Sequence, residues 1–143
     1  MSTENPIILA FSGGLDTSFC VPWLKENYQR PVVTVTVDTG GLDRRATEAL
    51  AKRALDLGAA DHALIKAKEE FFDRILKFLL IGNVRRGHLY PLCVGAERGI
   101  QATQLAKAAQ KFGSDTVAHG CTAAGNDQVR FEIILKKLRT ISI

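Results

Sequence analysis

Cysteine is scarce in this sequence of 143 residues, and the three that occur, Cys20, Cys93 and Cys121, lie far apart. An odd number of widely spaced cysteines gives no sign of a disulfide framework. The lack of a C-x-x-C pair likewise argues against a zinc or redox site. We therefore expect reduced thiols, as in a cytosolic protein, and no metal site built from protein ligands alone.

Long apolar runs and a strong charge of one sign are also absent. The run at 6–11 breaks at Ser12-Gly13-Gly14, and the run at 75–81 contains Lys77, so neither suits a signal sequence or a membrane span. The 19 basic and 15 acidic residues leave a net charge of +4, which suits an anionic ligand but is too small to indicate nucleic acid. With 46% hydrophobic residues, one cytoplasmic domain can bury its own core.

Short β-rich runs alternate with segments of helical period. Strands are predicted at 7–11, 32–37 and 116–118, and a weaker one at 63–65. Four apolar helical faces are expected: Ala46, Ala49, Leu50, Ala54 and Leu57; Phe72, Ile75, Leu76 and Leu79; Ile100, Leu105, Ala108, Ala109 and Phe112; Phe131, Ile134, Leu135 and Leu138. Asp43 is suited to cap the first of these helices, Gly58 to end it, and Gly113 to end the third.

This alternation predicts an α/β fold, a doubly wound parallel sheet with helices on both faces. Ligands of such folds bind where strands lead into helices, at the carboxyl ends of the strands. The stretch 82–95, with three glycines, reads as a long loop, and residues 139–143 begin like a further strand.

The best-defined motif is the first strand-to-helix loop, F-S-G-G-L-D-T-S at 11–18. Glycines let the backbone approach an anion closely, and the N–H groups of the following helical turn point toward it. No lysine of the Walker type is present, so a grip on the γ-phosphate is not expected. The order S-G-G-x-D-[ST] resembles the pyrophosphate loop (PP-loop) of ATP pyrophosphatases, which cut ATP between the α- and β-phosphates.

Ser12 and Asp16 are the candidate catalytic residues of this loop. The Ser12 hydroxyl can donate to a phosphate, and the Asp16 carboxylate can help to hold Mg²⁺ that accompanies the nucleotide. A cap on the following helix is an equal alternative for Asp16. A glycine pair alone would be only a tight turn, but the preceding strand and the hydroxyl groups favour phosphate binding.

A second motif, H-G-C-T-A-A-G-N-D-Q-V-R-F-E at 119–132, makes the resemblance more specific. Together with A-F-S-G-G-L-D-T-S at 10–18, it resembles argininosuccinate synthase, and the similarity spans nearly the whole chain. The resemblance implies that 1–143 is the PP-loop nucleotide-binding domain, and that the C-terminal synthetase domain of the family, which completes the site and supports a homotetramer, is absent.

The resemblance also implies a reaction and its substrates, which are ATP, citrulline and aspartate. Citrulline attacks the α-phosphate to give citrullyl-adenylate and pyrophosphate, and aspartate then displaces AMP. ATP would contact Ala10, Phe11, Ser12, Gly13, Gly14, Leu15, Asp16, Thr17, Ser18, Val37 and Gly120. Aspartate would contact Thr122, Asn126 and Asp127, and citrulline would contact Tyr90, Asn126 and Arg130.

Each amino-acid contact has a structural alternative. Asn126 or Asp127 could cap a helix, Tyr90 could pack in a loop, and Arg130 could be a solvated helix residue. The segment 93–96 offers no hydroxyl where the family supplies one to citrulline, and Ala123-Ala124 departs from the family pattern. No role is assigned to His62, His88 or His119.

Two other functions therefore stay open. The chain could be another PP-loop ATP pyrophosphatase, such as a tRNA-modifying enzyme, although the tRNA-thiolating ones usually need reactive cysteines near the nucleotide and the three here are scattered. It could also be a non-catalytic nucleotide-binding module that kept the phosphate loop and lost the second substrate.

Overall fold

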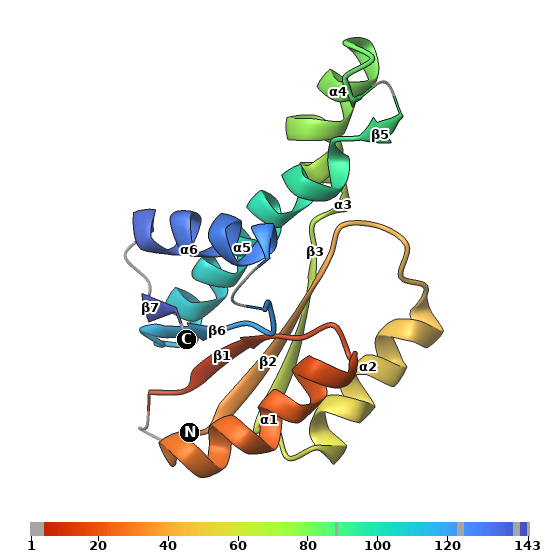
Figure 1. Ribbon diagram of the computed structural model, residues 1–143. Coiled ribbons are helices and arrows are strands. Elements are labelled where there is room, and N and C mark those ends of the chain that lie inside the picture. Colours follow the sequence, from red (N-terminus) through yellow and green to blue (C-terminus); the bar gives the residue numbers. More distant parts are fainter. Residues whose placement is uncertain (1–4, 88, 123–124, 139–140, 143) are drawn as a thin grey trace.

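The computed structural model describes residues 5–87, 89–122, 125–138 and 141–142 (Figure 1). The strands are β1 Ile7–Ala10, β2 Val32–Asp38, β3 Asp61–Lys66, β4 Arg85–Arg86, β5 Tyr90–Pro91, β6 Thr116–Ala118 and β7 Ile141–Ser142. The helices are α1 Leu15–Tyr28, α2 Arg44–Asp56, α3 Lys68–Phe71, α4 Lys77–Ile81, α5 Cys93–Lys111 and α6 Asn126–Lys137, with a π-helix, η1, at Phe72–Leu76. No helix among these residues is both long and apolar enough to cross a bilayer.

The predicted parallel sheet is confirmed, with five strands in the order β3-β2-β1-β6-β7. All neighbours in it are parallel, and β1 lies at the centre, paired through Ile7 with Val32 of β2 and with Thr116 of β6. The strand expected beyond 138 is present as β7. The weaker strand expected at 63–65 is longer, because β3 pairs with β2 along its whole length.

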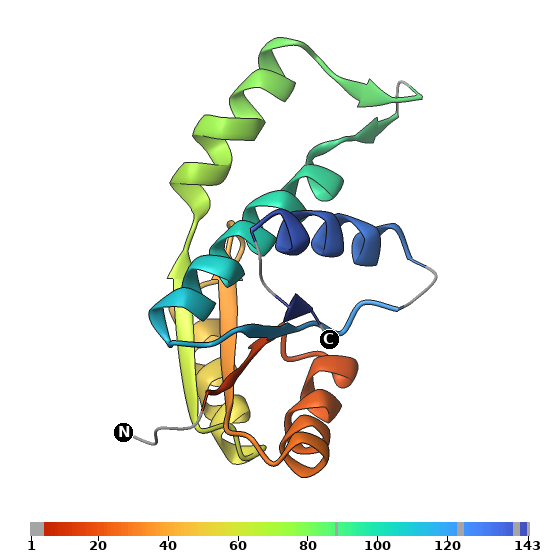
Figure 2. The same cartoon turned by 90° about the vertical axis from the view of Figure 1, so that its left-hand side faces the viewer.

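Helices cover both faces of the sheet, as expected for a doubly wound fold (Figures 1 and 2). Successive strand residues point to opposite faces. Ile8 therefore packs with buried residues of α5 and α6, such as Leu105 and Leu135, whereas Ile7 and Leu9 pack against α1 and α2. The apolar runs of the central strands are needed because both faces of a parallel sheet are buried.

The signals expected at the ends of α2 are confirmed. The Asp43 carboxylate accepts a hydrogen bond from the Ala46 N–H at 2.7 Å, and Gly58 follows the helix with φ +95°. Ala54 of the predicted face is fully buried. Local capping chemistry and the apolar period agree here, so the sequence alone locates this helix.

Three expected apolar faces are partly wrong, and on the α2 face it is Ala49 that is exposed. Phe72 is 48% exposed, and its neighbour Phe71 is buried instead. The π-helix η1 between α3 and α4 is the reason, since its wider turns shift the phase of the 3.6-residue period. Leu138, expected on the α6 face, is also exposed, because it lies at the carboxyl cap just beyond the helix.

The long loop expected at 82–95 is wrong as well. Strands β4 and β5 form a short antiparallel hairpin there, and α5 already begins at Cys93. No side chain caps the start of α5, and Gly95 lies inside its first turn, so the sequence carries no local signal for this helix start. Helix α4 and the hairpin extend away from the sheet in both views (Figures 1 and 2).

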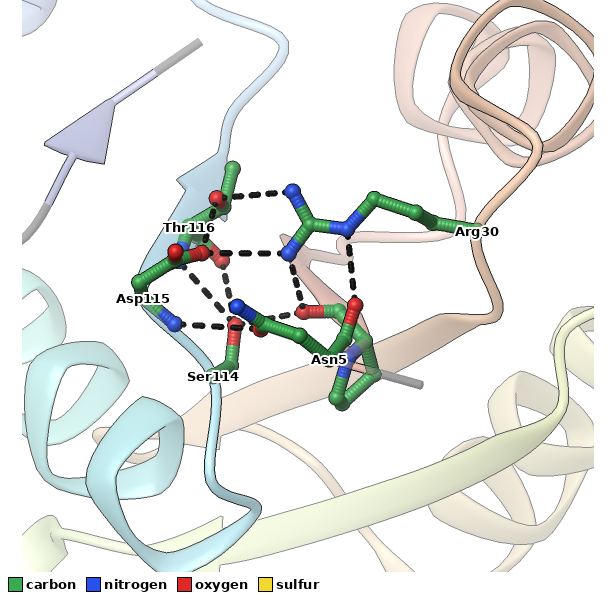
Figure 3. Close-up of polar contacts among 6 residues, drawn as sticks. Asn5, Arg30, Ser114, Asp115 and Thr116 are labelled. Carbon is green, nitrogen blue, oxygen red and sulfur yellow. Dashed lines mark hydrogen bonds and ion pairs between the residues drawn. The ribbon is translucent and has the colours of Figure 1, made fainter. Parts of the chain in front are cut away.

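Arg30 joins the amino ends of β1 and β6 (Figure 3). Its guanidinium donates to the Asn5 carbonyl at 2.7 Å, to the Pro6 carbonyl at 3.2 Å, and to Thr116 Oγ1 and Asp115 Oδ1 at 3.1 Å each. Hydrogen bonds from Thr116 and Arg30 lower the pKa of the Asp115 carboxyl. This cluster lies at the edge of the sheet opposite to the carboxyl ends of the strands.

Candidate functional site

The strand order places a crevice at the carboxyl ends of β1 and β6. The chain runs outward from β1 through β2 to β3 and then returns to the other side of β1, and ligands of open α/β sheets bind at such a switch point. A cavity of about 380 Å³ lies there, within the range of small-ligand sites. It is lined by residues from the ends of β1, β2 and β6 and from α5 and α6.

Gly13 holds the first loop in a conformation that other residues would strain. Its φ is +73°, it is buried, and an added Cβ would overlap the Leu50 side chain of α2. The Gly13 carbonyl accepts a hydrogen bond from Arg53 Nη1 at 2.6 Å. Helix α2 therefore fixes both the path and the orientation of this loop.

The amino end of α1 is open to an anion. Its N-cap is Gly14, which supplies no side-chain hydrogen bond to the first turn, so the N–H groups there keep their donor capacity. Ser12 Oγ lies 3.1 Å from Thr17 Oγ1 and accepts from the Gly14 N–H at 3.3 Å. Asp16 is exposed in the first turn and does not act as the side-chain cap that was its alternative.

Gly120 brings the second motif against the first loop. An added Cβ at Gly120 would lie 3.0 Å from Thr17 Cγ2 and 3.5 Å from Asp16 Cβ, so only glycine allows this approach without displacement. Two segments about a hundred residues apart in the chain therefore form one wall of the cavity. Both motifs singled out in the sequence take part in it.

Asp127, in the first turn of α6, is held by two arginines. Its Oδ2 accepts from Arg98 Nε at 3.1 Å and its Oδ1 accepts from Arg130 Nη1 at 2.7 Å. Burial opposes ionisation of this carboxyl, but the hydrogen bonds and charges of the two arginines outweigh it and lower the pKa of Asp127. The N-cap of α6 is Gly125, so Asp127 is not the cap that was its structural alternative.

The lowered pKa of Asp127 predicts how substitution changes acid stability. A carboxyl with a depressed folded-state pKa stabilises the fold above its unfolded pKa of about 3.9 and loses that contribution as pH falls through the folded value. We expect D127N to reduce the free energy of unfolding at pH 7 and to have a smaller effect below about pH 3. Urea unfolding of both proteins at each pH measures this; an equal difference at the two pH values would contradict it.

The structure brings some of the predicted site residues together and leaves others apart. Those that line the cavity are Ala10, Phe11, Ser12, Thr17, Val37, Gly120 and Asp127. Gly14, Leu15 and Ser18 instead line a second, open pocket with Arg53 and Leu57, where the buried Ser18 hydroxyl has no hydrogen-bond partner among the described residues.

Of the residues predicted to contact citrulline and aspartate, only Asp127 is among the described residues that line the cavity. Thr122 and Asn126 are exposed beside the cavity, and Arg130 reaches toward it only through Asp127. The backbone of Tyr90 lies in β5, but its side chain lies outside what the structure describes, as do Ala123-Ala124 and His88.

Several lining residues were missed from the sequence. Asp38 is the last residue of β2 and Thr39 follows it; both come after the strand predicted at 32–37, and polar residues in that position were a usable signal. Glu97, Arg98 and Gln101 also line the cavity, but they lie within α5, whose start the sequence does not mark. Only the crossing of α5 over the sheet brings these three side chains to the site.

His119 and Cys121 also lie at the cavity. Burial lowers the pKa of His119, and this effect is larger than the opposite effect of the nearby Glu132 charge. The centre of the His119 ring lies 5.2 Å from the centre of the Phe131 ring. Burial and the Asp127 charge raise the pKa of Cys121, so its thiol stays protonated at neutral pH. The three cysteines are free, as expected, but one of them, Cys121, does line the cavity.

The two motifs that form this wall both lie within the stretch of the chain that a family model matches. The model of the family described as "Arginosuccinate synthase N-terminal HUP domain" matches residues 6–142. The chain belongs to the argininosuccinate synthase family. A relative named argininosuccinate synthase from Sulfurisphaera tokodaii is 42% identical over 132 residues, covering 92% of this chain and 33% of its own length.

Another argininosuccinate synthase, from Xanthomonas axonopodis pv. citri, is 44% identical over 138 residues. The match covers 96% of this chain and 33% of that protein. The chain thus spans about a third of the length of these relatives. Among solved structures, an NH3-dependent NAD synthetase from Campylobacter jejuni aligns with a TM-score of 0.61 at 16% identity, covering 85% of this chain and 49% of its own.

A predicted subunit of tRNA methyltransferase from Methanocaldococcus jannaschii aligns equally well, with a TM-score of 0.61 at 16% identity over 97% of this chain and 68% of its own. At such low identity these likenesses support the α/β fold alone. The family assignment, in contrast, rests on sequence and separates this chain from the tRNA-modifying alternative.

Proposed function

We propose that this chain binds ATP and provides the nucleotide half of an argininosuccinate synthase, which joins citrulline and aspartate with release of AMP and pyrophosphate. The observation that carries the proposal is that both family motifs line the cavity at the switch point between β1 and β6. Because the chain spans a third of its relatives, turnover would require residues beyond those in this sequence.

The first loop suits the pyrophosphate end of ATP. The open amino end of α1 and the hydroxyl groups of Ser12 and Thr17 supply donors at one place. The hydrogen bond from Arg53 to the Gly13 carbonyl fixes the loop from the side of α2. Donors fixed in advance stabilise the charge that grows on pyrophosphate as it leaves. The adenosine would lie toward Val37, at the end of β2.

Mg²⁺ belongs to this proposal as a partner of the nucleotide. The described residues contain no group of three side chains that could hold a metal by themselves. Magnesium commonly keeps several waters and binds through one or two carboxylates together with substrate phosphates. The exposed Asp16 carboxylate, beside Thr17 and Gly120, fits that role.

The amino-acid substrates would bind around the amino end of α6. Asp127 can accept from the aspartate amine, and the Arg130 guanidinium can contact a carboxylate of citrulline. The ion pairs of Asp127 with Arg98 and Arg130 support this by fixing the carboxylate in place. Thr122, Asn126 and Tyr90 would complete these contacts.

Calorimetric titration of the chain with ATP and with pyrophosphate, with and without Mg²⁺, tests the proposal. We expect both ligands to bind, ATP more tightly with Mg²⁺, and we expect citrulline to change the affinity for ATP. Lack of binding by both ligands would refute the proposal. Binding of ATP without any response to citrulline would instead support a non-catalytic nucleotide-binding module.

The same proposal includes the cytoplasm as compartment and a homo-oligomer as assembled state. The free cysteines agree with a reducing compartment. Exposed apolar side chains on α4 and between β4 and β5, such as Phe78, Ile81 and Leu89, agree with contacts to other protein surface. Sedimentation velocity measures the assembled state, and a strictly monomeric chain would contradict this part.

A further inference from the structure

The described residues that line the cavity include one cationic side chain and three acidic ones. Among the lining residues in the described part of the chain, Arg98 is the only lysine or arginine, and the acidic ones are Asp38, Glu97 and Asp127. The first loop has no lysine of the Walker type, so Arg98 is the one basic side chain that an entering phosphate or carboxylate meets among the described residues that line the cavity. An oxyanion without such a cation would be repelled by the carboxylates.

Arg98 is held in place by its neighbours on α5 and α6. Its Nε donates to Asp127 Oδ2 at 3.1 Å, and its Nη1 donates to Gln101 Oε1 at 2.9 Å. Gln101 Nε2 in turn donates to Glu97 Oε1 at 2.8 Å, which also accepts from the Thr39 hydroxyl at 2.5 Å. A hydrogen-bonded chain thus runs from the loop after β2 to α6 and fixes the guanidinium along one wall.

The guanidinium keeps free donor capacity in this arrangement. Of the five N–H donors of arginine, these two hydrogen bonds use one each, and the side chain is 28% exposed. The remaining donors form a planar group that matches the oxygens of a phosphate or a carboxylate. Fixed orientation lowers the entropy lost on binding, because the side chain is already ordered.

We propose that Arg98 binds an oxyanion of the ligand in this cavity, either the phosphate of an adenylate or a carboxylate of the amino-acid substrate. The inference rests on the proposed function and adds to it a cation that the first loop lacks. Asp127 shares the same guanidinium and therefore competes with the incoming anion. Removing the cation and removing this competitor should change affinity in opposite directions.

The experiment compares R98M with R45M by calorimetric titration of the full chain with AMP, succinate and pyrophosphate. Succinate carries the carboxylates of aspartate without its amine. Arg45 is exposed on α2 and does not line the cavity, so R45M controls for the loss of one charge. Thermal unfolding of each variant checks that it is folded.

We expect R98M to lower the affinity for AMP or for succinate by at least about tenfold, the worth of a charge-assisted hydrogen bond, and R45M to change it less than about twofold. A loss confined to AMP identifies the phosphate as the ligand group, and a loss confined to succinate identifies the carboxylate. Pyrophosphate affinity should stay within about twofold, since α1 and the first loop provide its donors.

A third variant, D127N, separates ligand binding from a structural role. If Arg98 binds the anion, D127N raises the affinity for the probe that R98M weakens. Equal weakening by R98M and D127N would mean that the ion pair only supports the fold, and would overturn the inference. So would equal titrations of R98M and R45M, or a wild-type chain that binds pyrophosphate but neither AMP nor succinate. Failure to bind pyrophosphate and ATP would count against the proposed function instead.

Discussion

Replacing Gly13 by alanine is expected to lower the affinity for ATP and for pyrophosphate by about a hundredfold or more. The positive φ of Gly13 costs an L-residue about 1–2 kcal/mol, and the added methyl group overlaps Leu50. The loop must therefore move away from α2 and from Arg53. Loss of two hydrogen bonds to a charged phosphate, about 3 kcal/mol together, corresponds to about a hundredfold in affinity. Calorimetric titration of G13A with both ligands measures the loss.

Gly113 offers a matched control for this experiment. It also has a positive φ, +66°, but an added Cβ meets nothing within 4 Å, and it follows α5 away from the cavity. G113A should therefore lose stability by about 1 kcal/mol and keep its affinity for ATP. If G13A bound ATP as well as G113A does, the conformation of the first loop would not matter for phosphate binding.

Replacing Arg30 by methionine is expected to lower the free energy of unfolding by about 2–3 kcal/mol. Four acceptors lose a charged donor at once, and the side chain is only 27% exposed, so water replaces these hydrogen bonds incompletely. For a chain of this size, the midpoint of thermal unfolding should fall by roughly 5–10 °C. Urea and thermal unfolding measure both quantities.

Arg44 provides the comparison for Arg30. Its side chain is 92% exposed and pairs with Glu48 one turn along α2, and such surface ion pairs contribute at most about 1 kcal/mol. R44M should unfold much like the wild type. R30M should keep the wild-type affinity for ATP, since Arg30 lies at the opposite edge of the sheet from the cavity. An effect of R30M as small as that of R44M would show that the cluster at the strand starts contributes little.

Local patterns in the sequence determined most of the fold and the first half of the site. The apolar runs of β1 and β2, the Asp43 cap and the glycine pair at Gly13-Gly14 each act through residues near in sequence. Their consequences could therefore be predicted, and so could the α/β fold and a phosphate loop at the start of α1. The family motifs at 10–18 and 119–132 could likewise be recognised from their residue order alone.

The phase of the helices after β3 could not be read in this way. An apolar period of 3.6 residues puts Phe72 on the buried face, but the π-helix η1 turns Phe71 inward instead. Packing against α5 and the sheet stabilises that turn, and no residue type marks it. The start of α5 at Cys93 is likewise not marked by a capping side chain.

The second wall of the cavity was decided by tertiary structure alone. Glu97, Arg98 and Gln101 have no spacing or motif that sets them apart from any polar face of a helix. They reach the site because α5 crosses the sheet on the face opposite α1 and meets the first turn of α6 at Asp127. The sequence by itself determined the phosphate loop, because its chemistry is local; the position of the Arg98 cation at the cavity depends on how α5 and α6 pack.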